Sequence, residues 1–209
     1  MALRDRRLEP RKRAQQSRSR ATQARVLAAA ARVFEAHGYA AGTTNRIAET
    51  ARLSVGSVYQ YWPNKDAILA ELMRRHVAEG MAEIQRRLDD AGGLPRDLPA
   101  KVRLFVDAAI ANHAGNRRLH RVLFEEAPRP PALLAELHAL ESATVASVRK
   151  LLNDDGSVRV ADLDVAAYLV VAGIESLTHR FMTAAAPPAS DDRFAVELTR
   201  LFVSYLRSG

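Results

Sequence analysis

The sequence predicts an all-α fold, and two observations carry this prediction. Apolar residues recur at helical spacing in segments separated by Gly, Pro and Asn clusters, and no stretch of useful length alternates polar and apolar residues as a strand does. In addition, residues 43–69 have the pattern of two short helices around a tight turn, with a third helix directly after them. This is the layout of a helix-turn-helix reader of DNA.

The first predicted helix runs from about Thr22 to Ala36. Its apolar residues recur at a spacing that gives a helix one apolar face: Leu27, Ala30, Ala31 and Phe34. Gly38 follows and suits the left-handed backbone conformation that ends many helices. Tyr39, directly after it, is expected to pack beneath the helical module.

The second predicted helix opens at Thr44, whose hydroxyl suits an N-cap. Arg52 and Leu53 make the turn, and Ser54 caps the next helix. The narrow apolar stripe of the second helix consists of Ile47, Ala48 and Ala51.

The third predicted helix runs from about Val55 to Trp62, and its length of roughly 10–12 Å fits across one major groove. Val58 faces inward, Trp62 is expected to pack in the core, and Pro63 ends the helix because it supplies no N–H. The remaining residues face outward: Val55, Gly56, Ser57, Tyr59, Gln60 and Tyr61.

This outward face has the chemistry of a DNA-reading surface. Gln60 can donate and accept at one base edge, the pattern that adenine presents. Val55 and the Tyr59 ring offer apolar contact to thymine methyl groups, and Gly56 lets the backbone approach closely. Four residues can donate to phosphates, which positions a helix without reading sequence: Thr44, Ser57, Tyr61 and Lys65.

Residues 22–72 resemble the DNA-binding domain of TetR-family transcriptional regulators. The resemblance rests on these pairs and motifs: Thr43-Thr44, Ile47-Ala48, the turn at 51–54, Tyr59, the aromatic-Pro-Asn-Lys segment at 61–65, and Leu69. Arg52 stands where the family's turn has Gly, which costs about 1 kcal/mol if the backbone needs a positive φ there. Trp62 replaces a commoner Phe.

The resemblance implies a set of DNA-contacting residues, to which we add Arg46. The set consists of Thr44, Asn45, Val55, Gly56, Ser57, Tyr59, Gln60, Tyr61 and Lys65. The resemblance also implies a C-terminal helical domain that dimerises and binds a small-molecule effector, with about nine helices in the whole chain.

The net positive charge of the chain lies in its first 25 residues. This segment holds nine Arg or Lys against Asp5 and Glu9, whereas residues 26–209 hold 22 basic and 22 acidic residues. Like charges and few apolar residues predict a disordered arm over residues 1–21. The arm could be a targeting peptide, although no apolar segment follows it, or a solvated tail. We favour an arm that binds phosphates or a minor groove, because it leads straight into the helix-turn-helix.

Beyond the module the chain continues as helices. A fourth helix, from Asn64 to about Asp89, follows without a linker, and Gly and Pro residues at 91–95 make the first clear break. Further helices are predicted at about 97–114, 117–127, 131–153, 162–185 and 191–207. We therefore expect an arm at 1–21, a helix-turn-helix domain at 22–63 and a ligand-binding and dimerisation domain at 64–209.

The last two helices carry a signal for self-association. Residues 165–174 are nearly all apolar but too few to span a bilayer. One broad face of the final helix holds Phe194, Leu198, Leu201, Phe202, Tyr205 and Leu206. Alternatively, the two helices could simply complete the core of one subunit. The family resemblance favours an isologous homodimer through a four-helix bundle, which suits a palindromic operator.

The sequence offers little support for catalysis. It has no cysteine, which excludes disulfides and thiolate metal sites and fits a reducing cytoplasm. Phosphate-loop, His-Glu-x-x-His and Gly-x-Ser-x-Gly motifs are missing, and the histidines are spread along the chain. We expect no enzyme, no cofactor and no metal centre, and we interpret Glu125-Glu126 as a helix end.

The resemblance places an effector pocket among the central helices. Its candidate residues are polar or aromatic side chains within apolar helices: Phe105, His113, His120, Phe124, Glu175 and His179. Glu175 stands out because an unpaired buried carboxylate is costly. It should pair with Arg180, a neighbouring helix, a histidine or a ligand cation.

These observations favour a dimeric, ligand-responsive repressor in the cytoplasm that binds operator DNA and no membrane. A metabolite-binding protein or enzyme with a vestigial DNA-binding segment is the main alternative, and a non-specific nucleoid protein is another. The outward placement of Gln60, Tyr61 and Lys65 argues against a vestigial segment, because no other role needs that set.

Overall fold

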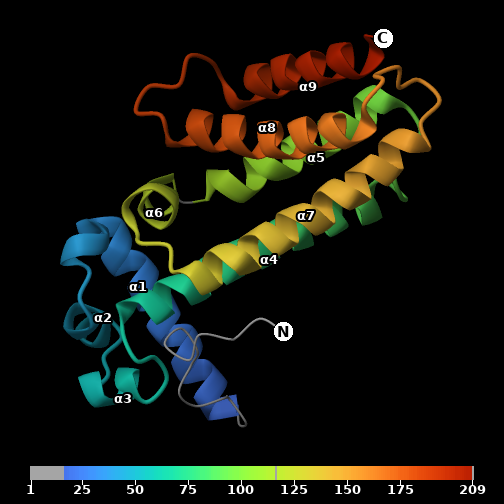
Figure 1. Ribbon diagram of the computed structural model, residues 1–209. Coiled ribbons are helices and arrows are strands. Elements are labelled where there is room, and N and C mark those ends of the chain that lie inside the picture. The colour runs from blue at the N-terminus through green and yellow to red at the C-terminus, as the bar shows by residue number, and fades with distance from the viewer. Residues whose placement is uncertain (1–16, 116, 209) are drawn as a thin grey trace. The chain divides into compact units, whose positions relative to one another are not determined.

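The computed structural model describes residues 17–115 and 117–208, and over these residues it is helical apart from turns and loops (Figure 1). The α-helices are α1 (Ser17–Ala41), α2 (Thr44–Thr50), α3 (Val55–Tyr59), α4 (Lys65–Asp90), α5 (Leu98–Ala114), α6 (Arg117–Arg121), α7 (Pro131–Asn153), α8 (Leu163–Thr183) and α9 (Asp191–Arg207). A π-helical turn, η1 (Val122–Glu126), follows α6. The predicted all-α fold of about nine helices is confirmed.

The chain forms two compact units. Of the described residues, the first contains 17–77 together with 118–134, and the second contains 78–115, 117 and 135–208. Helices α4 and α7 each contribute to both units. The first unit therefore joins the helix-turn-helix to a segment from the middle of the chain, which sequence order alone does not indicate.

Helix α1 begins earlier than predicted, at Ser17 rather than Thr22. The Thr22 hydroxyl donates to the Arg18 carbonyl at 3.0 Å, an interaction of a residue inside a helix rather than at its N-cap. Residues 17–21 of the predicted arm are therefore helical, and residues 1–16 of that arm lie outside the described residues.

The α1 helix breaks at Gly38, where φ is 72° and ψ is 178°. The positive φ agrees with the prediction, but the extended ψ differs from a left-handed C-cap, and helical backbone resumes as far as Ala41. Backbone of this kind is adopted almost only by glycine. A Cβ atom at Gly38 would also lie 2.9 Å from Glu126 Oε2, and the end of this flexible side chain would have to shift.

Side chains cap the short helices of the first unit. Thr43, not the predicted Thr44, is the N-cap of α2, because Thr43 has extended backbone and its hydroxyl accepts from the Arg46 N–H. Ser54 caps α3 by accepting from the Ser57 N–H at 3.1 Å, as predicted. Asn64 stands just before α4, and its Oδ1 accepts from the Ala67 N–H at 2.9 Å in the same way.

The turn between α2 and α3 has a positive φ at Arg52, the residue that stands where the family's turn has Gly. Arg52 has a φ of 53° and is the only described residue other than glycine with a positive φ. On either side of the turn the predicted inward residues Ile47, Ala48 and Val58 are buried. Helix α3 ends at Tyr59, three residues before the predicted end at Trp62.

The segment from the middle of the chain holds the end of α1. The predicted helix at 117–127 becomes π-helical from Val122, with the Ala127 N–H donating to the Val122 carbonyl at 3.1 Å. Arg118 donates to the Ala36 carbonyl at 3.2 Å. Glu126 Oε2 accepts from the Tyr39 N–H at 3.2 Å, on the far side of the Gly38 break.

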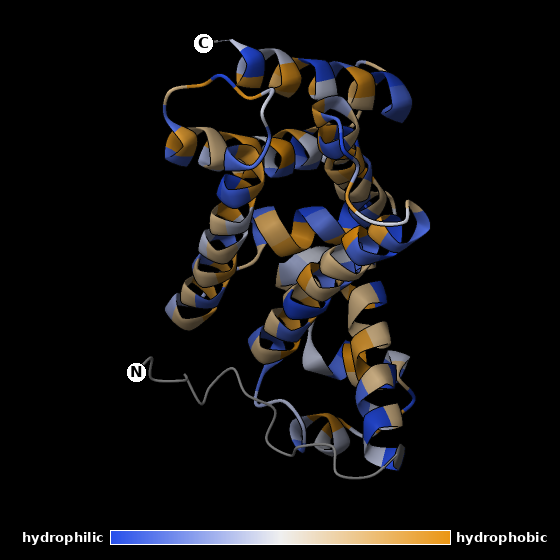
Figure 2. Cartoon of the chain, turned by 90° about the vertical axis from the view of Figure 1, so that its right-hand side faces the viewer, coloured by the Kyte–Doolittle hydropathy of each residue, from blue (hydrophilic) through white to orange (hydrophobic). Residues whose placement is uncertain are grey.

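In the second unit α5 packs against both α8 and α9, which lie beside it (Figure 1). Hydrophilic and hydrophobic residues alternate along α9, the helix that ends at the C-terminus (Figure 2). Its face is narrower than predicted, because Leu201 is 55 % exposed while Leu198, Phe202 and Leu206 are buried. The core of this unit consists of Leu98, Val102, Val106, Leu152, Ala166, Ala167, Val170, Ile174, Ala195, Leu198, Phe202 and Leu206.

Among the described helices, none has the length and hydropathy needed to cross a bilayer.

Candidate nucleic-acid interface and ligand sites

The outward face of α3 is largely as predicted. Val55 and Tyr59 are each 39 % exposed, although side chains of this size and apolar character are usually buried. Gly56 and Gln60 are exposed, and Ser57 is half-buried with its hydroxyl 2.8 Å from the Ser54 hydroxyl. The helix therefore presents an amide, a phenol ring and an aliphatic side chain to one side.

The start of α2 adds polar groups to this surface. The Thr44 hydroxyl lies 3.1 Å from the Tyr59 hydroxyl, so the first residue of α2 is hydrogen-bonded to the last residue of α3. Asn45 and Arg46 are exposed, and the Arg46 guanidinium donates to the Ala41 carbonyl at 3.4 Å. Both elements thus contribute to one candidate interface.

Tyr61 is not part of the outward face, and this prediction was wrong. Its side chain is 8 % exposed and its ring packs beside Trp62, with the ring centroids 5.8 Å apart. The Tyr61 hydroxyl accepts from the Ser19 hydroxyl of α1 at 3.2 Å. Because α3 ends at Tyr59, Tyr61 lies beyond the helix, and helical periodicity no longer directs its side chain outward.

Lys65 has a structural role in addition to any role at DNA. Its ammonium donates to the carbonyls of Tyr39 and Ala40 at 2.8 and 3.3 Å and lies 3.9 Å from the centre of the Tyr39 ring. The Tyr39 hydroxyl in turn donates to Asp66. Burial and this carboxylate raise the pKa of Tyr39, so the phenol stays protonated. Lys65 therefore ties the end of α1 to the start of α4.

The ligand candidates belong to both compact units of the chain. His120 and Phe124 lie in the first compact unit, where their rings stack with centroids 5.1 Å apart. His76, which the sequence did not single out as a candidate, joins them, since its Nδ1 lies 3.2 Å from His120 Nε2. Arg129 also reaches this group and donates to the Phe124 carbonyl.

His113, Glu175 and His179 form a second group, on α5 and α8 of the other unit. His113 is buried, its Nδ1–H donates to the Ala109 carbonyl at 2.8 Å, and its Nε2 lies 3.5 Å from Glu175 Oε1. Burial alone would lower the pKa of His113, but Glu175 outweighs it and the pKa lies above its usual value. Glu175 has one of the partners that were expected, a histidine, but its side chain is 56 % exposed rather than buried, because the apolar run of α8 extends beyond the buried face.

Phe105 lines a separate cleft of about 560 Å³ in the same unit. Apolar side chains from α4, α5, α7 and the loop after α4 form much of its wall: Leu88, Leu94, Phe105 and Leu151. Gln85 and Asp89 of α4 add polar groups. This volume lies in the range of small-molecule sites.

Two family models match the chain. The model described as "Bacterial regulatory proteins, tetR family" matches residues 26–72. The model described as "Tetracyclin repressor-like, C-terminal domain" matches residues 97–206, which is more than half of the chain. The chain belongs to the TetR family.

Solved structures share the TetR fold. A tetR-family regulatory protein from Rhodococcus RHA1 has a TM-score of 0.66 at 24 % identity, over 90 % of this chain and 98 % of that one. FadR from Bacillus subtilis, in complex with stearoyl-CoA, has a TM-score of 0.69 at 19 % identity, over 87 % and 97 %. AibR, in complex with isovaleryl coenzyme A and operator DNA, has a TM-score of 0.66 at 17 % identity, over 86 % and 97 %. No curated protein sequence matches the chain.

In this TetR-family chain, contacts that join distant segments could not be predicted from the sequence. The bond from Ser19 to Tyr61 and the bond from Tyr39 to Glu126 are examples, since their partners are 42 and 87 residues apart. No local spacing signals such pairs. The cap at Thr43, in contrast, follows the same rule that suggested Thr44, displaced by one residue.

Proposed function

We propose that this TetR-family regulator is a homodimeric repressor that binds a palindromic operator through α3 and is released by a small-molecule effector. The exposed face of α3 supports the proposal most directly. Val55 and Tyr59 are exposed beside Gln60, at the position in a helix-turn-helix that enters the major groove. Thr44, Asn45 and Arg46 extend this surface with groups suited to phosphate.

Exposed apolar residues on α8 and α9 support a homodimer. Six large apolar side chains on these two helices are 40–55 % exposed, which is unusual for the surface of a monomeric protein. They are Val165, Tyr168, Leu169, Leu177, Val196 and Leu201. A two-fold axis beside these helices would bury them in a four-helix bundle, with each protomer supplying one recognition helix.

Structures with the same fold support control by an effector. Two of these proteins are in complex with acyl-coenzyme A ligands, and one of the two complexes also contains operator DNA. A third is NalD from Pseudomonas aeruginosa, a secondary repressor of the MexAB-OprM multidrug efflux pump. We therefore expect an effector to weaken operator binding, and operator to weaken effector binding by the same factor.

The DNA-binding function can be tested by fluorescence anisotropy with DNA from the chain's own promoter region and a scrambled control. Gln60→Ala should weaken binding to the promoter DNA by about 1–3 kcal/mol and leave the scrambled DNA nearly unaffected. Arg46→Ala should weaken both alike and reduce the salt slope by about one unit. Equal effects of Gln60→Ala on both DNAs would refute base reading.

The dimer can be tested by sedimentation. Leu201→Arg together with Val165→Arg should convert the dimer to monomer and abolish high-affinity operator binding. Leu140→Arg, at an exposed apolar residue of α7, serves as the control and should leave the dimer intact. A dimer that survives the α8 and α9 changes would place the interface elsewhere.

A further inference from the structure

The cleft in the second unit has an apolar wall and one charge. Leu88, Phe105 and Leu151 come from three different helices and are each half-buried. Asp89 is the only charged residue among those that line the cleft in the described part of the chain. Its Oδ1 accepts from Gln85 Nε2 at 2.8 Å, and a carboxylate can accept further hydrogen bonds.

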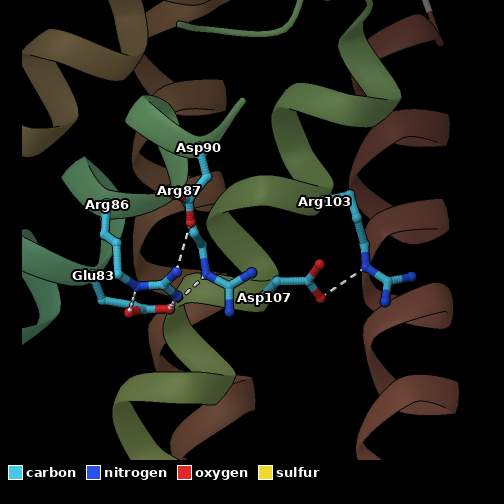
Figure 3. A network of polar contacts seen from close by, with 6 residues as sticks. All are labelled: Glu83, Arg86, Arg87, Asp90, Arg103 and Asp107. Atoms are coloured by element: carbon cyan, nitrogen blue, oxygen red, sulfur yellow. Dashed lines mark hydrogen bonds and ion pairs between the residues drawn. The ribbon is translucent and has the colours of Figure 1, made fainter. Parts of the chain in front are cut away.

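Three arginines close in sequence to these lining residues form ion pairs with other carboxylates. Arg87 donates to Glu83 at 2.7 Å, and Arg86 is bound between Glu83 and Asp90, at 2.7 Å from each (Figure 3). On α5, Arg103 pairs with Asp107 at 2.8 Å (Figure 3). The residues that line the cleft in the described part of the chain include no Lys or Arg.

The mouth of the cleft is formed by glycines. Gly92 and Gly93 have φ values of 70° and 119°. A Cβ atom built on either residue would meet nothing within 4 Å, so this edge is open to solvent.

We propose that this cleft binds lipophilic cations: molecules with an apolar body and a quaternary ammonium or protonated amine. The inference rests on the proposed function, because it names the chemical class of the effector. The apolar body packs against Leu88 and Leu151, while the cation is attracted to the Asp89 carboxylate and the face of the Phe105 ring. A carboxylate or a coenzyme A phosphate would instead face Asp89 without a cationic partner in the wall.

The test is calorimetric titration of the full chain with decyltrimethylammonium and with decanoate, both below the concentration at which they form micelles. The two probes share their chain length and differ in the sign of their charge. The ammonium should bind and decanoate should bind at least about fivefold more weakly, the ratio expected from one partly exposed ion pair. Decanoate binding as tightly as the ammonium, or no binding of the ammonium, would overturn the proposal.

Matched variants locate the site. Asp89→Asn should weaken ammonium binding about fivefold, whereas Asp90→Asn, at the adjacent carboxylate outside the cleft, should not. Leu151→Trp should fill the cleft and abolish binding, and Leu140→Trp, on the same helix but outside the wall, is its control. Equal effects within either pair would refute this site.

Operator binding by the same preparations separates this inference from the proposed function. Intact operator binding without ammonium binding would overturn the inference alone. Ammonium binding in a chain that does not recognise its promoter DNA would instead overturn the proposed function.

Discussion

The hydroxyls of Thr44 and Tyr59 lie 3.1 Å apart and join the start of α2 to the end of α3. The contact holds the Tyr59 ring on the exposed face. Tyr59→Phe removes the hydroxyl and keeps the ring, so we expect operator affinity to fall by about 1 kcal/mol, the usual contribution of one hydrogen bond. Anisotropy titration measures the affinity, and an unchanged melting temperature shows that the fold is intact. Unaltered affinity would remove the pair from the interface.

Two adjacent threonines at the start of α2 should differ in their effects: one contributes to stability and the other to DNA binding. Thr43→Ala should lower the free energy of unfolding by about 1 kcal/mol, because it removes the acceptor for the Arg46 N–H. Thr44→Ala should have a smaller effect on stability and a larger effect on operator binding. Urea unfolding of both variants checks the order, and the reverse order would assign the cap to Thr44.

Arg52 carries backbone strain, since its φ is 53°. A left-handed conformation costs a non-glycine residue about 1–2 kcal/mol, while glycine costs about 0.5–1 kcal/mol of unfolded-chain entropy. Arg52→Gly should therefore stabilise the protein by about 0.5–1 kcal/mol net. Arg52→Ala keeps the strain and should not stabilise. Equal stability of the two variants would show that loss of the arginine side chain, not the backbone, is responsible.

Gly38 should not tolerate a side chain. Gly38→Ala forces an unfavourable backbone region, at about 1–3 kcal/mol, and brings a Cβ atom against Glu126. Gly115→Ala is the control, because Gly115 has a helical φ of −68° and open space around it. Chemical denaturation should show clear destabilisation at residue 38 and none at residue 115.

Asp155 should make the second unit less stable at acid pH. Burial alone would raise its pKa, but hydrogen bonds from Lys101 and Ser157 outweigh this and lower the pKa from 3.8 to about 2. A carboxyl with a lowered pKa stabilises the fold above its unfolded pKa, and this stability is lost as the pH falls from about 4 through 2. Its size is about 2 kcal/mol at neutral pH.

Urea midpoints of wild type and Asp155→Asn, measured from pH 7 to pH 3, test this dependence. The difference between the two proteins should be constant above about pH 5 and narrow below pH 4. Asp154→Asn, at the exposed neighbour, should show no such difference. A gap that is independent of pH would mean that Asp155 contributes through hydrogen bonding alone.

The sequence by itself determined the elements and their chemistry where the decisive interactions are local. Caps act within three residues of a helix start, and Gly and Pro act on their own backbone. The start of α5 at Leu98, the end of α7 at Asn153 and the cap of α3 at Ser54 therefore agree with prediction within one residue. The outward placement of Val55, Tyr59 and Gln60 followed from helical periodicity in the same way.

Tertiary structure decided which side chains are exposed and which candidates lie together. Tyr61 is buried because its hydroxyl is hydrogen-bonded to Ser19 and its ring packs beside Trp62. The Lys65 ammonium donates to a backbone carbonyl at the end of α1. The ligand candidates belong to both compact units, and Asp89 lines a cleft with Phe105 although the two are 16 positions apart along the chain. The physical reason is that burial and long-range hydrogen bonding depend on the packing of whole helices, whereas helix periodicity and capping depend only on near neighbours in the sequence.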